Sequence, residues 1–123
     1  MEFDELSNRV IGCAIEVHRL LGPGLLESTY EQCLSYELGQ AGIGHKLQHP
    51  LPVQYKDVRL DCGYRVDVLV QDRMILELKS VEALLGIHQA QLLTYMKLAS
   101  IGTGLLINFN VPILKTGIKR LVL

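Results

Sequence analysis

Charged side chains interrupt two neighbouring apolar segments near the middle of the chain. Asp67 lies between two valines, while Glu77 and Lys79 flank Leu78. In an extended strand alternate side chains share a face, so Glu77 and Lys79 are expected to lie together, opposite the leucines. Carboxylates can bind a divalent cation, and an ammonium group beside them can act on a water molecule or a phosphate.

A hairpin is expected to join these two segments. If it turns about Asp72, Asp67 faces Glu77 across the strands at ~5 Å, and Lys79 lies ~7 Å farther along the same face. Two carboxylates at that separation repel each other unless something binds between them. Mg²⁺ is a natural partner, because it binds one or two carboxylates together with water and phosphate oxygens.

The alternative for Asp67, Glu77 and Lys79 is a solvent-facing charged cluster on a sheet edge. The apolar flanks of both segments favour a functional site, because a buried face does not carry three charges without a use.

A second candidate group follows the Gly22-Pro23-Gly24 break. Gly24, Glu27 and Tyr30 recur at three-residue steps and would share one helical face. Glu27 could add a carboxylate to the site. The structural alternative is that Glu27 interacts favourably with the helix dipole from the first turn and that Tyr30 belongs to the core.

A third candidate group lies on the helix expected after Lys79. His88, Gln91 and Tyr95 recur at steps of three and four and form one polar stripe on an otherwise apolar helix. The stripe could contact substrate or orient Lys79. It could equally be the polar rim of a packed helix that contains a half-buried tyrosine.

Hydrophobic periodicity predicts the elements that position these groups. Ser7 is a plausible N-cap for the first helix. Two prolines in the first strand place it at an edge or a bend. The order ααβββαβ, with an optional last strand, predicts an α/β domain with a mixed sheet flanked by helices. The helices are expected at residues 7–21, 25–39 and 81–99, and the strands at 47–55, 59–70, 74–79, 104–109 and 118–123.

Composition narrows the class of protein. The 123 residues are expected to form one domain, 1–123, and the net charge of −1 gives no electrostatic sign of nucleic-acid binding. No apolar run approaches a membrane helix, and the acidic N-terminus is unlike a signal peptide. The three cysteines lack CxxC spacing, so neither a disulfide framework nor a zinc site is expected. These features predict a cytoplasmic protein.

The motifs together resemble a known family. Gly24-x-x-Glu27-x-x-Tyr30 is similar to the signature of the GxxExxY proteins, which belong to the PD-(D/E)xK nuclease-like superfamily. Asp67 matches the motif aspartate of that superfamily, although Val66 replaces the usual preceding proline. Glu77-Leu78-Lys79 matches (D/E)xK, and residues 91–95 resemble the QxxxY motif of RecB-like nucleases.

The resemblance implies a restriction-endonuclease-like core and Mg²⁺- or Mn²⁺-dependent phosphodiester hydrolysis, on DNA more than on RNA. It implies that metal is held by the groups Asp67, Glu77, the Leu78 carbonyl and Glu27. Lys79 and Gln91 would be catalytic, and Tyr95 and His88 would contact substrate. A homodimer would enlarge the small surface available for a duplex. Two alternatives remain at this point: an inactive nuclease-fold module that binds nucleic acid or protein, and a phosphohydrolase acting on a small phosphoester.

Overall fold

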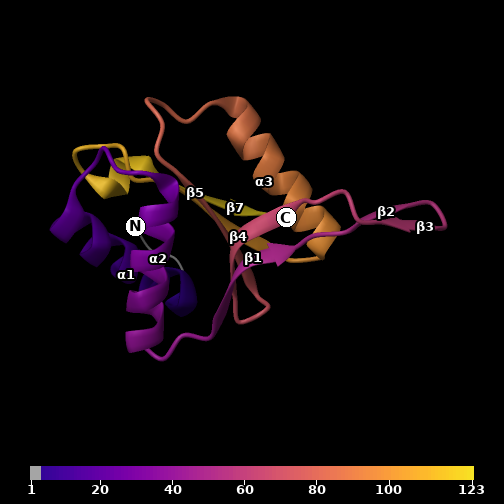
Figure 1. The fold of residues 1–123 in the computed structure, drawn as a ribbon, viewed down its shortest axis with the longest axis horizontal. Helices are drawn as coiled ribbons and strands as arrows, with labels where there is room; N and C mark the ends of the chain where they lie inside the picture. Colours follow the sequence, from indigo (N-terminus) through magenta and orange to yellow (C-terminus); the bar gives the residue numbers. More distant parts are fainter. Residues whose placement is uncertain (1–3) are drawn as a thin grey trace.

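A computed structural model describes residues 4–123 (Figure 1). Met1, Glu2 and Phe3, part of the acidic N-terminal segment considered above, lie outside the described residues. The helices are α1 (Glu5–Leu21), α2 (Glu27–Gln40), α3 (Gly86–Ala99) and the short 3₁₀ helix η1 (Leu114–Gly117). The strands are β1 (His45–Pro50), β2 (Val53–Tyr55), β3 (Val58–Leu60), β4 (Arg65–Val70), β5 (Met74–Lys79), β6 (Thr103–Asn108) and β7 (Ile118–Val122).

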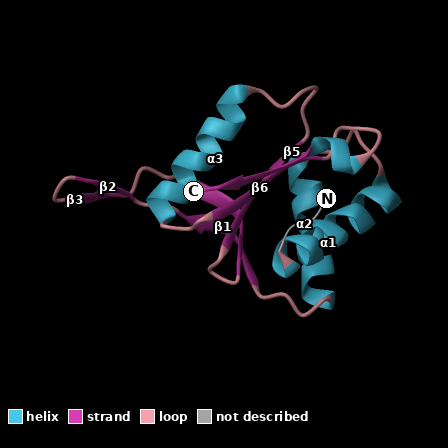
Figure 2. Ribbon diagram, turned by 180° about the vertical axis from the view of Figure 1, so that it is seen from behind, coloured by secondary structure: helices cyan, strands magenta, loops and turns pink. Residues whose placement is uncertain are grey.

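Five of the described strands form one mixed sheet in the order β1-β4-β5-β6-β7. Only β5 and β6 pair in parallel, and helix α3 makes the crossover between them. Helices α1 and α2 cover one face of the sheet, and α3 covers the other (Figure 2). Strands β2 and β3 form a separate hairpin that projects from the body. The predicted α/β fold, a mixed sheet flanked by helices, is confirmed.

Alternation along β5 divides its side chains between two cores. Leu76 and Leu78 pack with α1 and α2, whereas Ile75 packs against Leu92 and Met96 of α3. Each of these five side chains is at most 1% exposed. Burying a leucine-sized side chain contributes ~1.5–3 kcal/mol, so β5 is held firmly from both faces. The end of β5, where the charged residues lie, is therefore a rigid platform.

The first helix begins earlier than predicted. Asp4, not Ser7, is the N-cap, and Oδ1 of Asp4 accepts a hydrogen bond from the Ser7 backbone N–H at 2.7 Å. That bond, reinforced by the Arg120 side chain, lowers the pKa of Asp4 to about 2. Ser7 is fully buried and donates its hydroxyl to the same carboxylate. The predicted N-cap, Ser7, is therefore wrong, and the helix is capped by Asp4, three positions earlier.

Two of the predicted strands are each divided into two shorter strands in the structure. The predicted strand 47–55 is divided into β1 and β2 around Leu51 and Pro52, and the segment 59–70 is divided into β3 and β4. In the second break Gly63 adopts a φ of 78°, and its N–H bonds the side chain of Asp61. The order of helices and strands therefore contains two more strands than predicted before α3.

Helix α3 begins at Gly86 rather than near Val81. The side chain of Asn108, 2% exposed in β6, accepts from the Val81 N–H at 3.1 Å and donates to the Val81 carbonyl at 3.0 Å. These bonds hold the chain in a non-helical loop after β5. A contact between residues 27 positions apart overrides the local helical pattern.

Candidate active site

Asp67 and Glu77 meet where β4 and β5 stop pairing. Val70 pairs with Met74 next to the turn, and the last pair of the ladder is Val68 with Leu76. This is the register predicted for a turn about Asp72. At the next position the Asp67 N–H lies 3.4 Å from Oε1 of Glu77. The carboxylates are thus neighbours at the fork between two strands.

Burial, together with the nearby Asp67, changes the acidity of Glu77. Its side chain is only 6% exposed. Burial, followed by the charge of Asp67, raises the pKa of Glu77 to about 9, and the Lys79 ammonium group opposes the shift. Without a cation, Glu77 therefore keeps its proton at neutral pH, because burial and the adjacent charge of Asp67 both disfavour its ionised form.

The backbone of Leu78 faces the same fork. The Leu78 N–H donates to Oδ2 of Asp67 at 2.8 Å, whereas the Lys79 carbonyl accepts from Phe109 beyond β6. Because the N–H and C=O of one strand residue point to the same edge, the Leu78 carbonyl is directed toward β4 and Asp67. A carbonyl oxygen beside two carboxylates is a set of ligands suited to a hard divalent cation.

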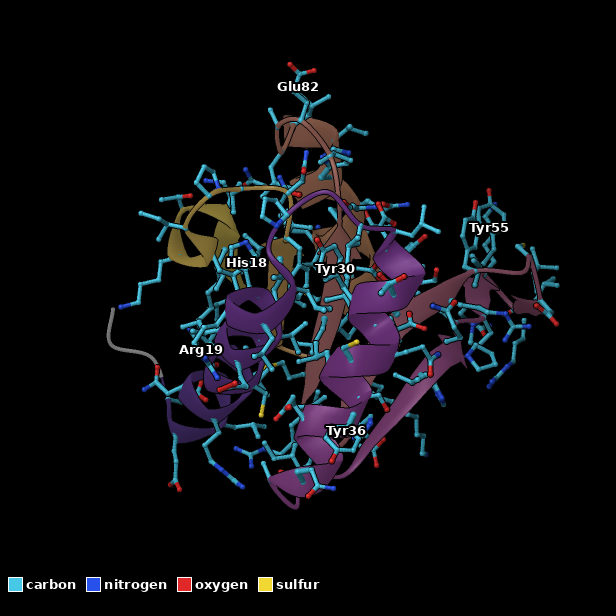
Figure 3. The ribbon with its side chains drawn as sticks, turned by 60° about the vertical axis from the view of Figure 1, so that its left-hand side comes forward. His18, Arg19, Tyr30, Tyr36, Tyr55 and Glu82 are labelled. Carbon is cyan, nitrogen blue, oxygen red and sulfur yellow. The ribbon has the colours of Figure 1, made fainter. Side chains whose placement is uncertain are left out.

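Glu27 is brought to this platform by a tight connection between α1 and α2. Gly24 adopts a φ of 96°, in the region that favours glycine, and Glu27 is the first residue of α2. Tyr30 points from α2 into the core and stacks on Phe109 at 4.4 Å (Figure 3). Its hydroxyl donates to the Gly22 carbonyl at 2.6 Å and accepts from the Leu25 N–H at 3.1 Å. Tyr30 therefore shapes the loop that presents Glu27.

Ser80 joins that loop to the end of β5. Its N–H donates to Oε2 of Glu27 at 3.2 Å, and its hydroxyl donates to the Leu25 carbonyl at 2.6 Å. Sequence reasoning missed Ser80. The residue follows the (D/E)xK segment directly, but nothing in its type or spacing indicates a contact with a residue 53 positions away.

Glu27 and Asp67 line one cavity of about 440 Å³ together with Ser28, Glu31, Gln48 and Leu78. Glu31 is 8% exposed, and burial raises the pKa of its carboxyl group. Among residues 4–123, no three His, Cys, Asp or Glu side chains lie close enough together to hold a metal ion by themselves. A cation here would need the Leu78 carbonyl and water as well, which suits Mg²⁺ because it usually keeps several waters.

Helix α3 contributes Tyr95 and Gln91 from the other side of the sheet. The Gln91 amide donates to the Tyr95 hydroxyl at 3.1 Å, and the Tyr95 ring lies 6.0 Å from that of Tyr64. Burial, followed by the charge of Glu77, raises the pKa of Tyr95. Tyr95 is therefore close enough to Glu77 to interact with it electrostatically.

His88 makes a hydrogen bond within the first turn of α3. Its Nδ1 accepts from the Leu85 N–H at 3.0 Å. Lys79 is half-buried at the end of β5, where its charge affects Glu77. Thus Asp67, Glu77 and Leu78 lie in direct contact around the fork, Glu27 borders it, and His88 caps a helix.

The comparisons with known proteins agree with this geometry. No curated protein and no solved structure matches the chain. The family model described as the PD-(D/E)XK nuclease superfamily matches residues 4–121, a span that contains the fork and all three helices of the two layers. Over nearly its whole length, the chain belongs to the PD-(D/E)XK nuclease superfamily.

Proposed function

We propose that this protein hydrolyses phosphodiester bonds in nucleic acid, in DNA more than in RNA, with Mg²⁺ or Mn²⁺. The observation that carries the proposal is the position of the buried Glu77 carboxyl group at the strand fork, where it lies 3.4 Å from the backbone nitrogen of Asp67. The superfamily generally uses divalent metals on nucleic-acid substrates. Glu77 is a buried carboxyl group that keeps its proton when no cation is bound. It can release that proton when a cation binds, because metal ligands must be deprotonated.

The residues around the fork fit a divalent cation. Asp67, Glu77 and the Leu78 carbonyl would hold it, with Glu27 as a further ligand through water. When bound, the cation would polarise the scissile phosphate and lower the pKa of a bound water. The protein supplies the oxygen ligands on a strand that is packed on both faces, so their geometry is preorganised.

Lys79 would act next to the ligands. Its ammonium group would orient the attacking water or stabilise the charge that develops on the phosphate. Gln91 and Tyr95, bonded to each other, would orient Lys79 or the substrate backbone, and His88 would contact substrate at the start of α3. Orientation of this kind lowers a barrier because the reacting groups are already in place.

We also propose a subfamily, a domain organisation, a cellular location and an oligomeric state for the protein. The Gly24, Glu27 and Tyr30 motif supports membership of the GxxExxY subfamily, and residues 1–123 are proposed as one nuclease domain. None of the helices in residues 4–123 is long and apolar enough to cross a membrane. The cysteines of that part of the chain are free thiols, which supports a cytoplasmic location. A homodimer would double the surface offered to a duplex.

A second candidate function is a nuclease-fold module that binds nucleic acid or protein without cutting. The net charge of −1 favours protein as the partner of such a module, because most nucleic-acid interfaces are strongly basic. The two candidates differ in one measurement. With Mn²⁺ and single- or double-stranded DNA or RNA, a nuclease cuts and loses that activity in the Asp67→Ala variant.

The matched control for that experiment is Asp57→Ala. Asp57 is exposed in the turn between β2 and β3, away from the fork. Cleavage by wild type and Asp57→Ala but not by Asp67→Ala supports the nuclease. Binding of Mn²⁺ without cleavage, across metals and pH, favours the inactive module.

A further inference from the structure

One side chain connects two of the cavity carboxylates. Gln48, in β1, lies between Glu31 of α2 and Asp67 of β4. Its amide nitrogen lies 2.6 Å from Oε1 of Glu31 and 3.3 Å from Oδ1 of Asp67. An amide nitrogen carries two donor hydrogens, so one Gln side chain can donate to both carboxyl groups.

The backbone of Gln48 leaves the regular strand to make these contacts. Strand β1 pairs with β4 at Leu47 with Val68 and at His49 with Val66, but Gln48 and Asp67 between them are not paired. Gln48 has a φ of 49°, which is uncommon for a residue other than glycine. Such a conformation persists only where surrounding contacts hold it, and it occurs often at functional sites.

Gln48 completes the restraint on Asp67. Oδ2 of Asp67 accepts from the Leu78 N–H, and Oδ1 accepts from Gln48, so each oxygen has its own donor. The Leu78 bond alone would leave the carboxylate free to rotate about that one contact. The buried Glu31 carboxyl group, in turn, holds the Gln48 amide, whose nitrogen is closer to Glu31 than to Asp67.

We propose that Gln48 is a positioning residue that orients Asp67 for metal binding and catalysis, with Glu31 as its anchor rather than as a metal ligand. The inference rests on the proposed function, since it concerns the same site. It implies that Gln48 is needed for its amide donors and that Glu31 is needed as a hydrogen-bond acceptor rather than as a charge.

The first experiment compares Gln48→Leu with Gln54→Leu. Gln54 is an exposed glutamine of β2 whose amide bonds only the nearby Lys56 carbonyl among the contacts seen. We expect Gln48→Leu to bind Mn²⁺ at least threefold more weakly by calorimetry and to lower kcat about tenfold, with KM for DNA changed less than about threefold. Gln54→Leu should match wild type in Mn²⁺ affinity, kcat and KM.

Gln48→Gly separates the amide from the backbone. Glycine adopts a positive φ without strain, so this variant keeps the strand conformation even if the leucine variant folds poorly. If Gln48 were present only for its backbone, Gln48→Gly would bind Mn²⁺ and cut like wild type, and the inference would be wrong. We expect it to show the same losses as Gln48→Leu.

Glu31→Gln and Glu31→Leu test the anchor. Glutamine retains an oxygen that can accept from Gln48, whereas leucine does not. We expect Glu31→Gln to keep Mn²⁺ affinity and kcat within about threefold of wild type and Glu31→Leu to lose both. Equal losses in both variants would make Glu31 a ligand. If wild type binds Mn²⁺ but does not cut, the proposed function fails, while the Mn²⁺ affinities still decide the role of Gln48.

Discussion

The backbone N–H of Leu78 donates to the side chain of Asp67 at 2.8 Å, at the position where β4 and β5 stop pairing. The carboxylate takes the place that a backbone carbonyl of β4 would occupy in a continued ladder. This bond holds the strands close enough for the Asp67 and Glu77 carboxyl groups to meet. It also leaves the Leu78 carbonyl, which faces the same edge, beside them.

Divalent metal is expected to stabilise the wild-type protein through Asp67. A ligand that binds only the folded state adds ~2.7 kcal/mol at a hundred times its dissociation constant. Asp67→Ala should lose most of the rise in melting temperature that Mn²⁺ produces, as measured by scanning calorimetry. Asp57→Ala, changed at an exposed aspartate, should keep it. An equal rise in wild type and Asp67→Ala would show that Asp67 is not a ligand.

The raised pKa of Glu77 predicts how stability depends on pH without metal. The folded pKa of about 9 lies above the ordinary value of 4.5 for a glutamate, so the folded state binds more protons between these two pH values. The contribution of Glu77 to the free energy of unfolding is then fully present below pH 4.5 and falls as pH rises toward about 9, by up to ~1.4 kcal/mol per pH unit. Glu77→Gln should flatten this fall in urea unfolding curves recorded with a chelator.

The control for the pH experiment is Glu82→Gln. Glu82 is exposed in the loop after β5 and points away from the body (Figure 3). Glu82→Gln should leave the pH dependence of the free energy of unfolding the same as in the wild type. A wild-type free energy of unfolding that is flat from pH 5 to pH 9 would contradict the raised pKa of Glu77.

Lys79→Ala is expected to separate catalysis from metal binding. Loss of one electrostatic or proton-transferring group should lower kcat at least ~100-fold. Mn²⁺ affinity should be kept or rise, because an ammonium group is not a ligand and repels the cation. Calorimetry and single-turnover cleavage measure the two effects, with the exposed Lys115→Ala as control. Activity that survives Lys79→Ala combined with Glu77→Ala would place the active site elsewhere.

Tyr95→Phe tests the stripe on α3. The substitution keeps the ring against Tyr64 and removes only the hydroxyl that Gln91 contacts. We expect a fall in kcat of about tenfold or more with a nearly unchanged melting temperature, since the hydroxyl would act by orientation. Gln91→Ala should behave in the same way and leave Mn²⁺ affinity intact. The matched control is Tyr36→Phe, at a tyrosine that is 64% exposed on α2. Equal cleavage rates in Tyr95→Phe and wild type would show that the Tyr95 hydroxyl has no role in the active site.

The sequence by itself determined the central pair of the site. Asp67 and Glu77 lie on adjacent strands joined by a short turn, and the position of that turn specifies which residues face each other. The α/β class followed from periodicity in the same way. These features depend on neighbours in the chain, where side-chain spacing is a reliable guide.

The tertiary structure decided the surroundings of that pair. Gln48 reaches Asp67 across 19 positions, and Ser80 reaches Glu27 across 53. Asn108 prevents α3 from starting at Val81. Such contacts join single polar side chains that belong to no repeating pattern. They form only when packing of the apolar faces brings their elements together, because the geometry of that packing, rather than the spacing of residues in the chain, sets the distance between donor and acceptor.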